Sequence, residues 1–161
     1  MHGCTPQAWA EPPRARRFKH CAAVGGIAQL FWDLDDATVP SPQLHVLAQA
    51  NASLASGYLA VGFGNTPEKM VPASVAAAVV SAEQAAPEVY DYRLTGYAPP
   101  NNGPGHMNLS STSAALADGV MTLRFSRPLV CADTEVEAIK PGAKTNLIVA
   151  TKKTPGWGTH D

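Results

Sequence analysis

Charged and aromatic side chains are both scarce in this sequence. Of its 161 residues, 16% are Asp, Glu, Lys or Arg, and 7% are Phe, Trp or Tyr. Twelve basic and thirteen acidic residues leave a net charge of -1, and the basic residues cluster only in the segment 14–19. Proteins that bind nucleic acids carry a basic face or stripe. We therefore expect no nucleic-acid partner.

Long apolar runs are missing as well. The longest mainly apolar stretch, 71–80, is interrupted by Pro72 and Ser74. It is about half as long as the roughly 20 residues needed to cross a bilayer. Residues 1–17 lack the apolar core of a secretory signal. We predict no membrane-spanning segment, and the missing signal says little about the compartment.

The short motifs that mark many enzymes are also missing. The sequence has no Gly-rich phosphate loop, no His-Glu-x-x-His helix, no Cys-x-x-Cys-His segment and no Gly-x-Ser-x-Gly elbow. Its five histidines are scattered without metal-ligand spacing. Hydrolysis therefore has no support in the sequence, and we expect the chain not to be an enzyme by itself.

Only three cysteines are present, so at least one thiol is left over within the chain. Cys21 and Cys131 lie at the ends of predicted strands and are candidates for a disulfide, and Cys4 with Cys21 is the competing pair. Sequons at Asn51 and Asn108 offer two sites for glycans. Disulfides and glycans both belong to oxidising compartments. These features favour an extracellular glycoprotein.

The length fits one domain. Residues 1–17 contain prolines and a basic cluster without periodicity, so we interpret them as an arm or linker before a domain over 18–161. Short runs rich in β-branched and aromatic residues alternate there with turn-forming clusters. The predicted strands are 27–34, 44–50, 58–63, 74–80, 89–94, 120–125 and 146–150. Their number and spacing predict an all-β fold, an antiparallel, immunoglobulin-like β-sandwich.

Two of these segments carry further information. In 120–125, Met121, Leu123 and Phe125 alternate with polar neighbours, which predicts one buried face. The Ala-rich segment 75–80 has helix propensity. We predict a strand there because turn signals on both sides leave too little room for a typical helix.

An ordered set of segments resembles a DOMON domain over roughly 21–160. No one segment is decisive, and the order carries the resemblance. The set consists of LFWDLDD (30–36), YLAVGFG (58–64), Met70, DYRLTGY (91–97), LRFSRPL (123–129), NLIVAT (146–151) and His160.

The resemblance implies a β-sandwich that binds either haem b or a sugar or other small ligand. In haem-binding DOMON domains the axial ligands are a methionine after the Gly-rich strand end, which matches Met70, and a histidine after the last strand, which matches His160. Tyr58 stands where relatives commonly have tryptophan, and Pro72 and Ser74 replace their pattern after the methionine. The residues expected to line the haem are Val61, Phe63, Leu147, Val149 and Trp157.

The expected function is that of a b-type cytochrome domain, with extracellular one-electron transfer through iron ligated by Met70 and His160. Its partner would be a transmembrane b-type cytochrome or a flavin dehydrogenase, and membrane contact would come only through that partner. Arg124 or Arg127 would pair with haem propionates, and His106 is a reserve ligand. The alternatives are a haem-free sugar or small-ligand module and a structural or adhesion module of a larger surface protein.

Overall fold

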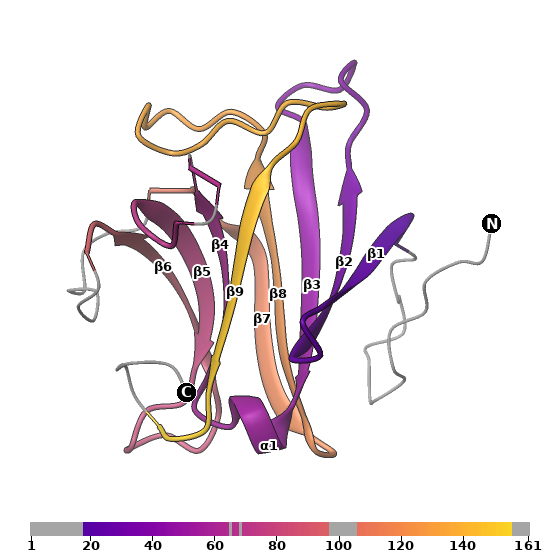
Figure 1. Cartoon of the computed structure of the whole chain (residues 1–161). Coiled ribbons are helices and arrows are strands. Elements are labelled where there is room, and N and C mark those ends of the chain that lie inside the picture. Colours follow the sequence, from indigo (N-terminus) through magenta and orange to yellow (C-terminus); the bar gives the residue numbers. More distant parts are fainter. Residues whose placement is uncertain (1–17, 65, 68, 97–105, 156–161) are drawn as a thin grey trace.

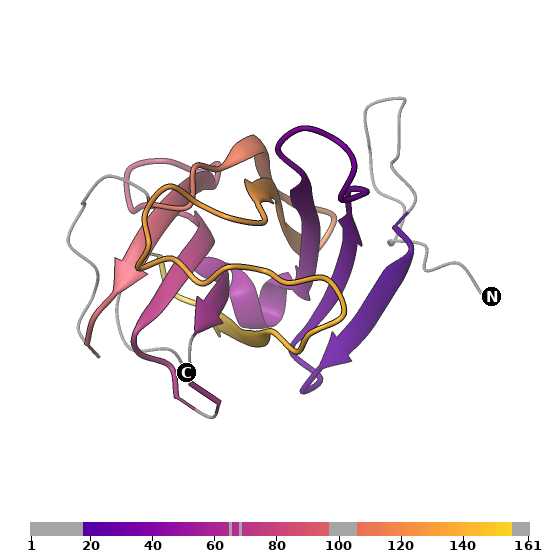
Figure 2. The same cartoon turned by 90° about the horizontal axis from the view of Figure 1, so that it is seen from above.

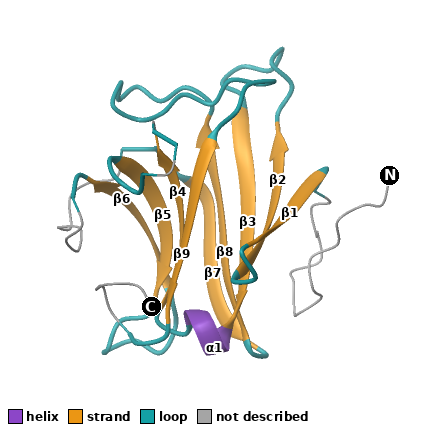
Figure 3. Cartoon of the chain, viewed as in Figure 1, coloured by secondary structure: helices purple, strands orange, loops and turns teal. Residues whose placement is uncertain are grey.

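A computed structural model describes residues 18–64, 66–67, 69–96 and 106–155. Two antiparallel sheets face each other with almost no helix (Figures 1 and 3), which confirms the predicted all-β antiparallel sandwich. The elements are β1 (His20–Val24), β2 (Ala28–Leu34), β3 (Gln43–Asn51), α1 (Ala52–Ala55), β4 (Tyr58–Gly64), β5 (Ala73–Val79), β6 (Glu88–Leu94), β7 (Ser110–Ala117), β8 (Val120–Pro128) and β9 (Asn146–Lys152).

The larger sheet has the strand order β1-β2-β3-β8-β7, and the smaller has β6-β5-β4-β9. Side chains that point inward from both sheets form the main core. Phe63 on β4 meets Phe125 on β8 edge to face, with ring centroids 6.2 Å apart. This contact joins the two sheets.

Strand β8 shows the predicted alternation. Met121, Leu123 and Phe125 are fully buried in the main core. Arg124 and Ser126 lie on the other face, in a hollow outside the sheet. The prediction of one buried face is therefore confirmed.

All seven predicted strands exist, whereas β1 and β7 were not predicted. Strand β7 has the sequence SSTSAALA, which lacks the β-branched apolar residues that mark strands. The Ala-rich strand β5 is confirmed as a strand, and all seven of its residues are buried. Small side chains suit this position because both faces of β5 are covered.

Tight turns join the hairpins. Gly25 and Gly26 both have positive φ between β1 and β2, and so do Asp118 and Gly119 between β7 and β8. Two successive positive φ values are typical of the type I′ turn, whose twist matches that of the paired strands. The predicted Asp-Gly turn is thus the connection of the β7–β8 hairpin.

One end of the sandwich is closed by the segment 129–145 between β8 and β9. Figure 2 looks down on this end and shows the segment, in gold, crossing over it. Leu129, Val136 and Ile139 are buried and belong to the main core. Among the described residues, no helix is long and apolar enough to cross a membrane.

We expect Val61→Ala to lower the free energy of unfolding by about 2 kcal/mol, because it removes two buried carbons and leaves a cavity. Val130→Ala is the matched control, since Val130 is 72% exposed and should change stability by less than about 0.5 kcal/mol. Urea unfolding measures both. Equal effects of the two substitutions would contradict the assigned core.

Candidate functional site

Met70 lies in the loop between β4 and β5, three residues before β5 begins. This loop folds over the outer face of the smaller sheet. A Cβ built on Gly64 would lie 3.5 Å from Ile148 Cδ1, 3.6 Å from the Pro72 carbonyl oxygen and 3.7 Å from that of Lys69. The loop therefore passes close to the ends of β4 and β9.

Between this loop and β9 runs an open groove of about 570 Å³, which we call the Met70 groove. Its volume lies within the range of about 300–1,000 Å³ typical of small-molecule and cofactor sites. The Met70 side chain is half-buried in it. The residues that line it are Thr66, Pro67, Lys69, Met70, Thr145, Asn146, Leu147, Ile148, Val149 and Ala150.

The outer face beside the Met70 groove is apolar. A cluster of buried small and aromatic residues, which we call the outer cluster, covers it, and Ile148 and Ala150 of β9 pack against that cluster. The outer cluster consists of Tyr58, Ala60, Ala73, Val75, Ala77 and Val79. The smaller sheet is thus apolar on both faces. Antiparallel sheets more commonly have one apolar face and one polar, solvated face.

A second hollow, the inner cavity, lies between the two sheets at the end that the segment 129–145 closes. It has a volume of about 240 Å³ and is lined mainly by apolar residues, among them Leu30, Trp32, Val61 and Phe63. Lys140 also lines it. Leu147, 45% exposed, lines both the inner cavity and the Met70 groove.

The structure divides the predicted haem-lining residues between these two hollows. Val61 and Phe63 line the inner cavity, and Val149 lines the Met70 groove together with Met70. Trp157 and His160 lie outside the described residues. Ile148 and Ala150 also line the Met70 groove, but the sequence analysis did not name them. The period of two along β9 places them on the face opposite Leu147 and Val149.

Neither predicted propionate partner lines the Met70 groove. Arg127 is fully buried, donates to the carbonyl oxygens of Pro128 at 3.1 Å and Glu137 at 2.6 Å, and stacks on the Phe63 ring at 4.7 Å. Arg124 lies on the outer face of the larger sheet. Arg127 instead ties the closing segment to the core.

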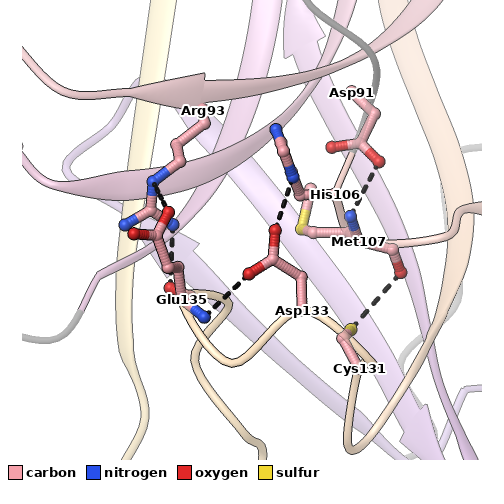
Figure 4. A network of polar contacts seen from close by, with 7 residues as sticks. All are labelled: Asp91, Arg93, His106, Met107, Cys131, Asp133 and Glu135. Atoms are coloured by element: carbon pink, nitrogen blue, oxygen red, sulfur yellow. Dashed lines mark hydrogen bonds and ion pairs between the residues drawn. The ribbon is translucent and has the colours of Figure 1, made fainter.

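Met107 and Cys131, whose sulfur atoms are neighbours of the Arg127 guanidinium, belong to a polar network that is drawn in Figure 4. Asp91 accepts a hydrogen bond from the Met107 backbone N–H at 2.9 Å, and His106 Nδ1 lies 2.5 Å from Asp133 Oδ2. Burial raises the pKa of Asp91, although hydrogen bonds from the 106–107 backbone lower it in part. The hydrogen bond from Glu135 N–H is the main cause that lowers the pKa of Asp133. His106, the reserve ligand, is thus hydrogen-bonded to Asp133.

Cys131 is a free and buried thiol. The predicted bridge between Cys21 and Cys131 is therefore wrong. The Cys131 thiol lies 3.4 Å from the Met107 carbonyl oxygen and 3.6 Å from the Arg127 guanidinium. Burial raises its pKa. The competing pairing of Cys21 with Cys4 stays a prediction, because Cys4 lies outside the described residues.

The fold defines the class of the protein as a β-sandwich of two antiparallel sheets with an apolar cavity between them. Comparison with protein families identifies a DOMON domain over residues 28–152. This match covers most of the chain, which therefore belongs to the DOMON domain family. The comparison with curated proteins found no match.

Because burial raises the pKa of Asp91 above its ordinary value of 3.8, the native state binds this proton more tightly than the unfolded state does. The resulting stabilisation is complete below the unfolded pKa and is lost as the pH rises through the folded pKa. Asp91→Asn keeps an oxygen that accepts from the Met107 N–H and removes this titration. We expect the wild type to lose stability relative to this variant as the pH rises from about 3.5 to 7, measured by urea unfolding.

Asp133→Asn is the control with the opposite sign. The folded pKa of Asp133 is lowered, so its contribution is present above the unfolded pKa and is lost as the pH falls. The wild type should gain stability relative to this variant as the pH rises. Parallel curves for the wild type and both variants would contradict these assignments.

Proposed function

We propose that this DOMON domain binds haem b and transfers single electrons, with Met70 and His160 as the two axial ligands. The observation that carries the proposal is the position of Met70. Its thioether belongs to a half-buried side chain in a groove of about 570 Å³. The inner cavity, with about 240 Å³, is smaller than typical cofactor sites.

The described residues of the Met70 groove fit a haem. A neutral thioether is a suitable axial ligand for haem iron, and Ile148 and Ala150 supply an apolar surface for the porphyrin. Lys69, exposed beside Met70, would place a cation near the propionates. In this arrangement Met70 would hold the metal, β9 would exclude water from the bound group, and Lys69 would balance charge.

His160 can meet the same group if the chain after β9 turns back. Residues 153 and 154 continue past the end of β9, since Ser56 Oγ donates to the Lys153 carbonyl oxygen and a Cβ built on Gly57 would meet the Thr154 carbonyl. The five residues 156–160 can span up to about 17 Å. This length can return from Pro155 to Ala150, five residues earlier in the chain, which lines the Met70 groove.

When bound, haem b would supply reversible one-electron chemistry. Met70 and His160 would both hold the iron, so the bound group would supply electron transfer rather than oxygen or peroxide chemistry. Methionine and histidine together raise the reduction potential. Through its haem site the protein would thus act as an electron carrier, with a transmembrane b-type cytochrome or a flavin dehydrogenase as its partner.

An extracellular or cell-surface location is part of this proposal. Asn51 and Asn108, the acceptors of the two sequons, are both exposed. Both could therefore carry glycans without disturbing the core. Such a domain would belong to a larger secreted or membrane-anchored protein.

The inner cavity supports a second candidate function, the binding of a small apolar ligand without haem. Apolar cavities of this kind stay dry and accept small apolar molecules. Leu147 at its mouth is exposed, which gives the ligand a route of entry. Such a module would need neither Met70 nor His160.

We expect Met70→Leu to change haem-loaded protein from six-coordinate low-spin to five-coordinate or high-spin iron, because the thioether is lost while the side-chain volume is nearly kept. Visible absorption of the oxidised and reduced forms measures this change. Met107→Leu is the matched control, since Met107 is fully buried and its variant should keep the wild-type spectrum. His160→Ala should weaken haem retention more than Met70→Leu does.

A wild-type spectrum in Met70→Leu together with an altered one in Met107→Leu would contradict the assignment of Met70. Such a result would move the ligand to the segment 106–107.

A further inference from the structure

A serine, a histidine and an aspartate form a hydrogen-bonded chain on the outer face of the larger sheet. His45 on β3 and Ser126 on β8 are direct cross-strand partners, and His45 Nδ1 lies 2.7 Å from Ser126 Oγ. On the other side of the ring, His45 Nε2 lies 2.8 Å from Asp35 Oδ1. The sequence gives no hint of this, because the three residues are brought together only by strand pairing.

The surrounding bonds fix the proton on this histidine. Asp35 is held in place by the Gln43 backbone N–H, which donates to its Oδ2 at 3.0 Å. An ionised carboxylate only accepts hydrogen bonds, so the His45 tautomer that donates through Nε2 is the one that satisfies Asp35. Nδ1 is then left as an acceptor for the Ser126 hydroxyl. This is the pattern of a nucleophile, a general base and a residue that orients the base.

Ser126 lines an open groove of about 460 Å³, which we call the Ser126 groove. Arg124 and the segment 111–113 line it too. The pairing of β7 with β8 is irregular between Ser110 and Ser113, and Ser111 has a φ of 48°. Bulges and positive φ at non-glycine residues are frequent beside functional sites.

We propose that Ser126 is the nucleophile of an acyl-transfer site that hydrolyses small carboxylic esters. Ser126 Oγ bonds to the ester carbonyl carbon while His45 Nδ1 takes its proton. The bond to the alkoxide then breaks, and His45 returns the proton to that leaving group. Water then adds to the acyl carbon while His45 Nδ1 takes its proton. The bond from that carbon to Ser126 Oγ breaks as His45 returns the proton to Oγ, which releases a carboxylic acid.

Features of the Ser126 groove define the substrate class. The Arg124 guanidinium and the hydroxyls of 111–113 can stabilise a developing oxyanion. Ser126 itself is only 4% exposed, which favours a short acyl group. The histidine ring is reversed relative to the common triad, in which Nε2 faces the serine. The chemistry needs only one ring nitrogen to accept while the other is fixed as a donor.

This site is independent of the proposed haem function. It lies on the outer face of the larger sheet, whereas the Met70 groove lies on the smaller one. Loss of haem binding would therefore leave it unchanged.

The test is covalent labelling of the full chain with a small alkyl fluorophosphonate, followed by intact mass and peptide sequencing. The Ser126 oxygen forms a bond to phosphorus, fluoride leaves and His45 takes the proton. We expect one adduct, on Ser126, and none in Ser126→Ala. His45→Gln and Asp35→Asn should slow labelling, the former by at least about a hundredfold, which is the lower range for general-base catalysis. Hydrolysis of p-nitrophenyl acetate should fall in parallel.

Ser53→Ala is the matched control, because Ser53 is an exposed serine that does not line the Ser126 groove, and the substitution should leave the labelling rate unchanged. Circular dichroism checks the fold of each variant, and Asp35→Asn serves where a change at His45 prevents folding. The proposal would be overturned by an adduct on another residue or by no adduct at all. It would also be overturned if Ser126 were labelled at the same rate in the wild type, His45→Gln and Asp35→Asn.

Discussion

The pairing of β4 with β5 on one side and β9 on the other is the interaction on which the rest of the structure depends. All seven residues of β4 are buried, and its side chains alternate between the two faces of the smaller sheet. Val61 and Phe63 point into the sandwich and meet the larger sheet, whereas Tyr58 and Ala60 belong to the outer cluster. One strand thus supplies both the core of the fold and the apolar surface beside Met70.

Sequence reasoning succeeded where apolar residues alternate and turns are marked. Strands such as β4, β8 and β9 contain β-branched or aromatic residues. Asp118-Gly119 is a residue pair that favours the two-residue turn of a hairpin. It failed for β7, because serine and alanine carry no strand signal and their pairing is settled by contact with β8. It also paired Cys21 with Cys131, although β2 and β3 lie between β1, which contains Cys21, and β8 in the larger sheet.

The candidate site was predicted in part. The resemblance located Met70, and the structure places it in a groove with Leu147 and Val149. Arg127 could not be located from sequence, since nothing in its neighbours signals a guanidinium that satisfies backbone carbonyls inside the core. A buried charge of this kind costs free energy unless its bonds are satisfied, and the closing segment 129–145 provides them. The hydrogen-bonded chain from Asp35 through His45 to Ser126 was likewise missed, because it joins two strands and a loop that are far apart in the sequence.

The two proposed sites therefore lie on opposite outer faces of the sandwich. The haem site lies on the smaller sheet, and the ester-hydrolysing site lies on the larger sheet. The proposal that the smaller one holds haem is tested most directly by titrating the purified full chain with haem and recording its visible spectrum before and after reduction with dithionite. We predict saturable uptake of one haem per chain, with sharp α and β bands of six-coordinate low-spin iron in the reduced form. A folded protein that takes up no haem specifically would contradict the proposal and would favour the inner cavity as the ligand site of this DOMON domain.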